Sequence, residues 1–96
     1  MDSSQITVKV ELTAQLKRAA GGSPVEVELS DGSTLRDLAQ ELGQRFEGLN
    51  GVLINTAGEP SASVLVFVND QQSRWDDDSA LESKNTVTLI SPISGG

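Results

Sequence analysis

Apolar and polar residues alternate in two segments near the start of the chain. Every second residue is apolar in the segment 6–12, ITVKVEL, and the segment 25–29, VEVEL, repeats the pattern. A period of two is typical of strands that bury one face, so both segments are predicted strands. The connection 14–22 is expected to include a short helical turn over 16–20. The residues SDGS at 30–33 predict a turn after the second strand.

The apolar period changes to that of a helix after this turn. Thr34 can act as an N-cap, and Asp37 stands in the first turn, where the helix dipole favours a negative charge. Gly48, directly after Glu47, is expected to end the helix in a left-handed conformation, and Gly43 weakens the last turn. The residues spaced to form one core-facing stripe are Leu35, Leu38, Ala39, Leu42 and Phe46.

The next strongly apolar segment is SVLVFVN at 63–69, which is apolar on both sides of the alternation. This pattern predicts a central strand with one face on the helix and the other at least partly covered. Before it come a short apolar piece at 52–54 and a glycine- and proline-containing stretch at 55–63, which is expected to be flexible. The residues DQQS at 70–73 are expected to form the turn that follows the strand.

The last part of the chain predicts one more strand and a projecting tail. A single helical turn is expected over 79–83, anchored by Leu81, and TVTLI at 86–90 is the last predicted strand. Pro92 cannot donate to a sheet, so the tail, residues 91–96, is expected to leave the sheet and remain flexible. The whole order predicts one α+β domain over residues 1–96, with one main helix packed across one mixed sheet.

Composition removes most kinds of side-chain chemistry. The chain contains no cysteine and no histidine, which excludes a thiolate nucleophile, a Ser-His-Asp triad, an imidazole base and a usual zinc site. Asp76, Asp77 and Asp78 form the densest acidic cluster, and such a run is usually a solvated turn. Gly21 and Gly22 lack the spacing of a phosphate-binding motif. We therefore expect no bound cofactor and no metal.

Charge and hydropathy limit the partners. The net charge of −7 disfavours nucleic acid, because phosphates would be repelled. The longest apolar run, Val64 to Val68, is too short to span a membrane. The N-terminal residues MDSSQ lack the pattern of a secretory signal, so a cytoplasmic location is the expectation. A protein partner with a basic face fits the charge best.

Several of these features together resemble the ubiquitin-like β-grasp sulfur carriers. The resemblance runs from about Ile6 to Gly96 and rests on the order of elements, on VFVND at 66–70, on TVTLI at 86–90, and on the ending SPISGG. The family includes the small subunit of molybdopterin synthase, the thiamine sulfur carrier and the ubiquitin-related modifiers. Two consecutive glycines can enter a narrow channel, because neither has a Cβ atom.

The resemblance implies that the reactive group is the C-terminal carboxylate of Gly96. In the family, an adenylating enzyme of the ubiquitin-activating type uses ATP to convert this carboxylate to an acyl-adenylate, and sulfur then replaces AMP to give a thiocarboxylate. A sulfur-accepting synthase subunit receives the tail. Pro92, Ile93, Ser94 and Gly95 are the residues expected to contact these partners, with Ile93 as an apolar anchor. The partners supply catalysis, so the chain is expected to be a carrier and not an enzyme.

The sequence departs from the family at two places. Lys84-Asn85 replaces a Gly-Asp turn, where Asn85 would tolerate a left-handed backbone. Three positions that are apolar in molybdopterin synthase small subunits are polar here, namely Thr13, Gln72 and Ser91. Phe67 and Trp75 could offer another apolar contact, although Trp75 could equally belong to the core.

Molybdopterin synthesis is the leading interpretation of the pathway. The alternatives are sulfur transfer for thiamine, cysteine or other thiolation, and conjugation of Gly96 to a lysine as a protein modifier. Both classes share the activation chemistry, so the residues do not separate them.

Overall fold

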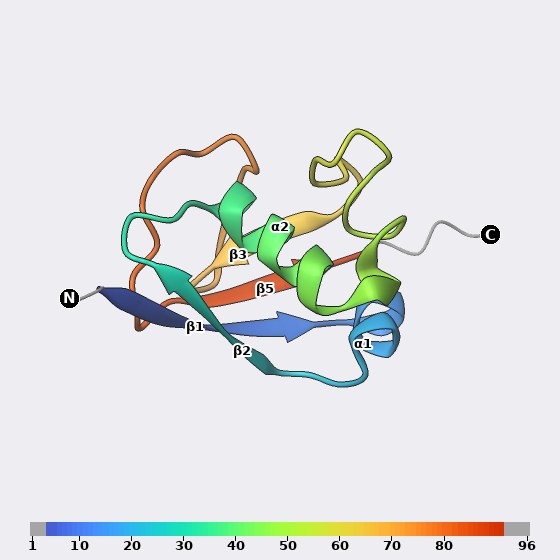
Figure 1. Ribbon diagram of the computed structural model, residues 1–96, viewed down its shortest axis with the longest axis horizontal. Coiled ribbons are helices and arrows are strands. Elements are labelled where there is room, and N and C mark those ends of the chain that lie inside the picture. The colour runs from blue at the N-terminus through green and yellow to red at the C-terminus, as the bar shows by residue number, and fades with distance from the viewer. Residues whose placement is uncertain (1–3, 92–96) are drawn as a thin grey trace.

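The predicted alternation at the start of the chain forms a hairpin of two antiparallel strands in the computed structural model, which describes residues 4–91 (Figure 1). These strands are β1, Gln5–Leu12, and β2, Val25–Ser30. The apolar residues of β1 are buried and the residues between them are exposed. The short helix α1, Ala14–Ala20, connects the strands, buries Leu16 and ends at Gly21, whose φ of 82° is left-handed. Both strand predictions are confirmed, and the helix begins two residues before the predicted turn.

Helix α2, Leu35–Arg45, crosses one face of the sheet (Figure 1). Its N-terminus is closed by two reciprocal bonds. The backbone N–H of Asp37 donates to Thr34 Oγ1, and the backbone N–H of Thr34 donates to Asp37 Oδ2. The predicted stripe is confirmed, because Leu35, Leu38, Ala39 and Leu42 are buried and Phe46 packs against the core.

The predicted role of Gly48 is wrong. Helix α2 ends at Arg45, Phe46 is extended with φ of −122°, and Gly48 lies inside the 3-10 helix η1, Glu47–Leu49. Gly48 is not among the glycines with positive φ. A Cβ atom at Gly48 would lie 2.8 Å from the carbonyl oxygen of Ala19, so this glycine is needed for close contact between η1 and α1.

A second correction concerns residues 70–73, which do not form one turn. Strand β3, Leu65–Val68, is followed by a two-residue turn and then by strand β4, Gln71–Ser73. The turn residues Asn69 and Asp70 have φ of 51° and 71°, the geometry of a tight hairpin in which both central residues are left-handed.

The predicted helical turn over residues 79–83 is also absent. The backbone N–H of Ser79 donates to Asp77 Oδ1, and the N–H of Leu81 donates to the Ser33 carbonyl at 2.8 Å. The N–H of Glu82, which a helical turn would bond to the Ser79 carbonyl, donates instead to Asn85 Oδ1 at 2.7 Å, so the segment follows an irregular path. Leu81 is nevertheless buried, which confirms its predicted role as an anchor.

The turn at Lys84-Asn85 forms without a left-handed residue, since neither residue has positive φ. Asn85 closes it instead, because its side-chain Oδ1 accepts a hydrogen bond from the N–H of Glu82 at 2.7 Å and its own N–H donates to the Glu82 carbonyl. The departure from the Gly-Asp pattern is thus accommodated by side-chain bonding.

Strand β5, Thr86–Ile90, completes a mixed five-stranded sheet in the order β2-β1-β5-β3-β4. It runs parallel to β1 and antiparallel to β3. The middle of the sheet is therefore β5. The segment that was predicted as central, residues 63–69, supplies β3, which is paired on both sides but leaves Leu65 exposed. The α+β class, the mixed sheet and the last strand are confirmed.

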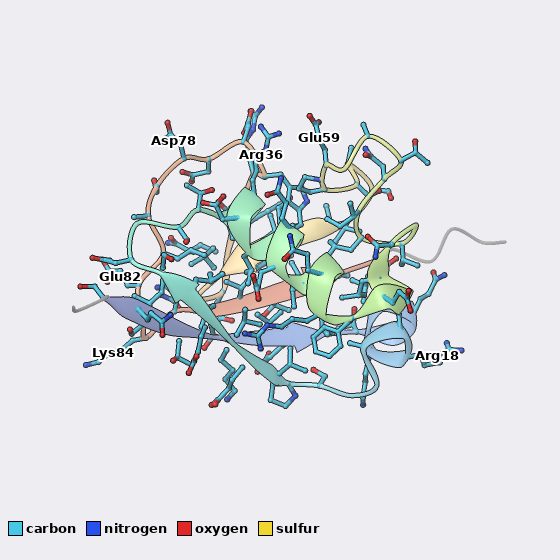
Figure 2. All side chains as sticks on the ribbon, viewed as in Figure 1. Arg18, Arg36, Glu59, Asp78, Glu82 and Lys84 are labelled. Carbon is cyan, nitrogen blue, oxygen red and sulfur yellow. The ribbon has the colours of Figure 1, made fainter. Side chains whose placement is uncertain are left out.

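The segment between η1 and β3 packs without regular strands. Leu53 and Ile54 are buried in the core, and Asn55 Oδ1 accepts hydrogen bonds from the backbone N–H groups of Ala57 and Glu59. An ion pair of 3.3 Å between Arg36 of α2 and Glu59 spans the two elements (Figure 2). Among residues 4–91, no helix is long and apolar enough to cross a membrane.

Candidate functional site

The predicted site residues Pro92, Ile93, Ser94, Gly95 and Gly96 lie outside the described residues. The structure does describe the base from which this tail begins. Ser91 follows β5, the middle strand, whose Val87 and Leu89 are fully buried. Leu89 is paired with β1 and with β3, and the last strand residue, Ile90, is paired with Leu65 of β3, so the tail begins directly after a held strand.

The outer face of the sheet, opposite to α2, has an apolar patch beside this point. Leu65 of β3 is directly opposite Ile90 of β5, and Phe67 lies one pair further along the same face. Leu65 is 37% exposed and is the large apolar residue that the described part of the chain exposes most; Phe67 and Ile90 are half-buried. We call Leu65, Phe67 and Ile90 the outer patch.

The outer patch has a polar border. Gln72 of β4 and Thr88 of β5 are the cross-strand neighbours of Phe67, and Glu11 of β1 pairs with Thr88 on the other side. Gln72 and Glu11 are exposed. Apolar surface with a polar rim is typical of a surface that binds another protein.

The three polar positions noted in the sequence have different environments. Gln72 faces the solvent beside the outer patch, whereas Thr13 and Ser91 are half-buried. The Thr13 hydroxyl donates to the Leu89 carbonyl at 3.2 Å, which ties the start of α1 to the end of β5. Thr13 thus supports the base of the tail. The sequence reasoning identified Phe67 but missed Leu65 and Ile90, although both alternate with the buried residues Val66 and Leu89.

Trp75 belongs mainly to the core. Its ring packs against the buried cluster, and its indole Nε1 donates to the Val64 carbonyl at 2.9 Å. Trp75 also lines an open groove of about 400 Å³ together with Leu65 and Pro60. Since Leu65 belongs to both, the groove extends the apolar surface of the outer patch.

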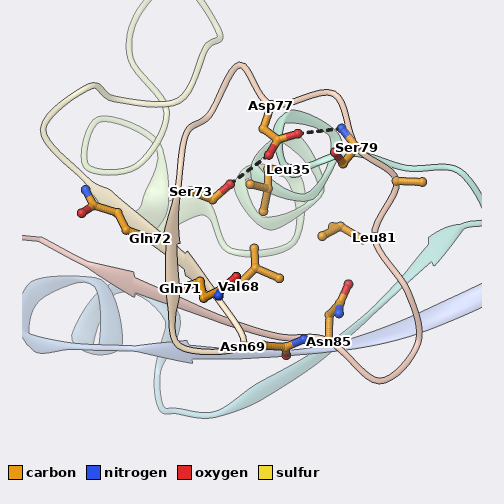
Figure 3. Close-up of a pocket in the computed structure, with 11 residues that line it drawn as sticks. Leu35, Val68, Asn69, Gln71, Gln72, Ser73, Asp77, Ser79, Leu81 and Asn85 are labelled. Carbon is orange, nitrogen blue, oxygen red and sulfur yellow. Dashed lines mark hydrogen bonds between the residues drawn. The ribbon is translucent and has the colours of Figure 1, made fainter.

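Another pocket, of about 300 Å³, lies under the 74–85 loop (Figure 3). Leu35, Val68 and Leu81 contribute its apolar lining, and the carboxylate of Asp77 points toward Ser73 and Ser79. Hydrogen bonds from the backbone and side chain of Ser79, and from the Ser73 hydroxyl, lower the pKa of Asp77 below its ordinary value. Asp77, the middle residue of the acidic cluster, is therefore part of a hydrogen-bonded loop.

Side chains in the described part offer little other chemistry. No group of three or more acidic residues is arranged to hold a metal within residues 4–91. The tail base and the outer patch are therefore the features that suggest a function.

Comparison with known proteins identifies the family. The model of the ThiS family matches residues 10–96, which is most of the chain. The chain belongs to the ThiS family. Proteins of this family are small sulfur carriers and not catalysts themselves.

Individual relatives agree with this placement. A curated molybdopterin synthase sulfur carrier subunit from Arabidopsis thaliana is 25% identical over 95 residues, covering 99% of this chain and 88% of the relative. A solved structure of a putative molybdopterin converting factor, subunit 1, from Pyrococcus furiosus is 27% identical, with a TM-score of 0.70, and covers 92% of this chain and 99% of that one.

The fold is also that of a modifier protein. SAMP1 from Haloferax volcanii superposes with a TM-score of 0.83 at 23% identity, covering 94% of this chain and 99% of that one. At this identity the similarity concerns the fold alone. The predicted ubiquitin-like β-grasp fold is confirmed.

Proposed function

We propose that this chain carries sulfur as a thiocarboxylate on its C-terminal residue, Gly96, and that it delivers this sulfur in the synthesis of molybdopterin. The observation that carries the proposal is the family match, which extends from Val10 through the Gly95-Gly96 end. The curated relative from Arabidopsis thaliana favours molybdopterin as the pathway. The sequence itself offers neither a cysteine nor a histidine for a side-chain mechanism.

The proposed chemistry begins at the Gly96 carboxylate. A carboxylate resists nucleophilic attack because it is negatively charged and has a poor leaving group. An adenylating enzyme of the ubiquitin-activating type would join it to AMP from ATP and release pyrophosphate. A persulfide sulfur would then attack the acyl carbon and displace AMP to give an acyl disulfide. A second thiol of the partner proteins would attack the other sulfur of this disulfide, form a new disulfide with it and release the thiocarboxylate. This chemistry would take place in the cytoplasm.

The described residues support this role through the position of the tail base. Ser91 follows the middle strand of the sheet, so the base would be held while Pro92 to Gly96 would enter a partner's active site. The outer patch lies beside the base and would contact the activating enzyme and the sulfur-accepting synthase subunit in turn. Pro92, Ile93 and Ser94 would contact the partner, with Ile93 as an anchor at the mouth of the channel that holds Gly95-Gly96.

The decisive experiment is an intact-mass measurement after incubation with a cognate activating enzyme, ATP and a persulfide donor. We expect a mass increase equal to the exchange of one oxygen for sulfur, and release of AMP. Deletion of Gly95 and Gly96 should abolish both effects without changing the melting temperature, because the last strand ends at Ile90 and the core is formed by residues that precede the tail. AMP release that survives the deletion would refute the role of Gly96.

The same reaction separates the alternative functions. A thiocarboxylate that is consumed by a molybdopterin synthase large subunit supports the proposed pathway, whereas consumption only by a thiamine or other thiolation enzyme identifies another acceptor. If the chain were found in isopeptide linkage to lysines of other proteins, it would be a modifier. SAMP1, which shares the fold, is a small archaeal modifier protein.

A further inference from the structure

Strand β2 forms an open edge of the sheet (Figure 1). It pairs with β1 on one side, and no other strand of the described structure pairs with its second side. The opposite edge strand, β4, has three residues and borders the pocket under the 74–85 loop. Strand β2 has six residues, so it is the longer of the two edges.

The pattern of hydrogen bonds shows which backbone groups β2 leaves available. The N–H of Asp31 donates to the Ser4 carbonyl at 3.0 Å, just beyond the pair Gln5–Ser30. In an antiparallel ladder, bonded and non-bonded pairs alternate. Val25, Val27 and Leu29 therefore direct their N–H and C=O groups toward β1, whereas Glu26, Glu28 and Ser30 direct theirs outward.

Most of these outward groups have no internal partner. The Ser30 carbonyl accepts a hydrogen bond from the N–H of Ser33 in the following turn. For the N–H and C=O of both Glu26 and Glu28, and for the N–H of Ser30, residues 4–91 provide no partner outside the β1–β2 ladder. These five groups form a half-ladder that an additional strand could complete.

The side chains along this edge carry charge of one sign on the outer face. Glu26 and Glu28 are both exposed, and their neighbours on β1 are Lys9 and Thr7. Asp31 follows the strand and is also exposed. On the other face, Val27 is buried under α2 and Val25 is half-buried. An added strand would thus meet carboxylates on one face and apolar surface on the other.

This charge pattern argues against a second copy of the chain as the occupant. If two β2 edges paired with each other, the glutamates of one copy would stand beside those of the other without a compensating base on either edge strand. Like charges on neighbouring strands are destabilising. The same glutamates would attract a strand that places lysine or arginine at every second position.

We propose that the β2 edge binds an extended segment of a partner protein that carries lysine or arginine at alternate positions. A strand along all six residues would be about 20 Å long, at about 3.3 Å per residue. Its backbone would bond to Glu26 and Glu28, and its basic side chains would lie against the two carboxylates. This surface is separate from the outer patch and the tail, so the proposal does not depend on the proposed function.

The test uses the full chain labelled with ¹⁵N and an acetylated, amidated peptide of alternating lysine and valine, with alternating glutamate and valine as the control. We expect the backbone amides of Glu26, Glu28 and Ser30 to exchange rapidly with solvent in the free protein. They should become protected, with large chemical-shift changes, when the basic peptide is added. The acidic peptide should leave them unchanged.

Two double variants separate local from overall charge. Glu26→Lys with Glu28→Lys should weaken peptide binding at least about tenfold, whereas Asp76→Lys with Asp78→Lys, the same change of net charge in the segment that follows β4 at the opposite edge of the sheet, should weaken it less than about threefold. Thermal melts establish that both variants fold.

Three results would overturn the proposal. The first is equal weakening by both double variants, which would indicate attraction to the net charge alone. The second is peptide binding without protection of the three amides. The third is protection that rises with protein concentration in the absence of peptide, which would make the edge an interface between two copies.

Discussion

At the residue scale, two glycines of this chain are required by close contact and not by backbone conformation. Gly48 would bring a Cβ atom to 2.8 Å from the backbone oxygen of Ala19, and Gly43 would bring one to 3.0 Å from Ile54 Cγ1. The first neighbour is main chain and cannot rotate away, whereas the second is a side-chain atom that can move. Gly48 is therefore the more restrictive position.

We predict that Gly48→Ala lowers the free energy of unfolding by about 1–3 kcal/mol, the usual cost of overpacking. The physical reason is that α1 and η1 must separate to admit the methyl group. Urea denaturation measures the change. Glu47→Ala, an exposed substitution in the same 3-10 helix, is the control and should change stability by less than about 0.5 kcal/mol. Equal stability of Gly48→Ala and wild type would contradict the contact.

Asp77 gives a prediction about pH. Its pKa is lower in the folded chain than in the unfolded chain, because Ser79 and Ser73 donate hydrogen bonds to the carboxylate. Its contribution to stability is therefore present above the unfolded pKa and is lost as the pH falls through the folded pKa. Asp77→Asn should lower the melting temperature at neutral pH, and the difference from wild type should shrink below about pH 4.

The matched control for this prediction is Asp76→Asn. Asp76 pairs with Arg74 on the exposed surface at 3.1 Å, and exposed pairs contribute little. A difference between wild type and Asp77→Asn that is the same at every pH would show that the carboxylate's charge is not involved.

At the element scale, the sequence predicted those elements whose apolar period is continuous. The alternation in β1 and β2 and the helical stripe of α2 each bury one face, so the pattern of residues carries the structure. The sequence did not predict β4, because Gln71, Gln72 and Ser73 have no apolar member and form a strand through pairing with β3. The helical turn predicted around Leu81 was wrong for a related reason, since the N–H of Glu82 bonds to the Asn85 side chain and the N–H of Leu81 bonds to Ser33, far away in the sequence.

Only one part of the candidate site, the tail, could be predicted from the sequence. The tail could be identified from its residues, because Gly95-Gly96 after a strand and a proline resembles the family. The outer patch could not be assembled in advance, because Leu65 and Ile90 become neighbours only through the β3–β5 register. A role for the tail itself remains a prediction, since residues 92–96 lie outside the described part of the chain.

Adjacent residues of β3 provide a test of the outer patch. Leu65 is exposed on the outer face, whereas Val66 is 1% exposed on the face covered by α2. Leu65→Asp should slow ATP-dependent AMP release by the activating enzyme while changing the free energy of unfolding by less than about 1 kcal/mol. Val66→Asp should unfold the domain, because it buries an unpaired charge. Unimpaired AMP release by folded Leu65→Asp would exclude the patch as the contact surface.

At the scale of the whole molecule, charge is distributed unevenly. Asp78 and Glu82, with Lys84, lie at the end of the molecule where β1 begins, and Arg18 of α1 lies at the opposite end (Figure 2). The tail starts near that second end, because the Thr13 hydroxyl, just before α1, bonds to Leu89 of β5. Asp78 and Glu82 of the 74–85 loop are thus remote from the tail base, although they contribute to the net charge of −7.

This arrangement predicts that charge affects the rate of encounter with the activating enzyme more than the lifetime of the complex. Raising the ionic strength from about 0.01 M to about 0.15 M shortens the screening length from about 30 Å to about 8 Å. The association rate of the wild-type chain, measured by stopped flow, should fall over this range if the enzyme's surface is basic.

A double variant tests the contribution of the 74–85 loop. Asp78→Lys with Glu82→Lys changes the net charge by +4, from −7 to −3. The variant should associate more slowly at low salt and show a shallower salt dependence. Its dissociation rate should equal that of wild type, because neither residue lies near the tail base. A salt-independent association rate would exclude steering by charge. Faster dissociation of the variant would place the 74–85 loop inside the contact surface.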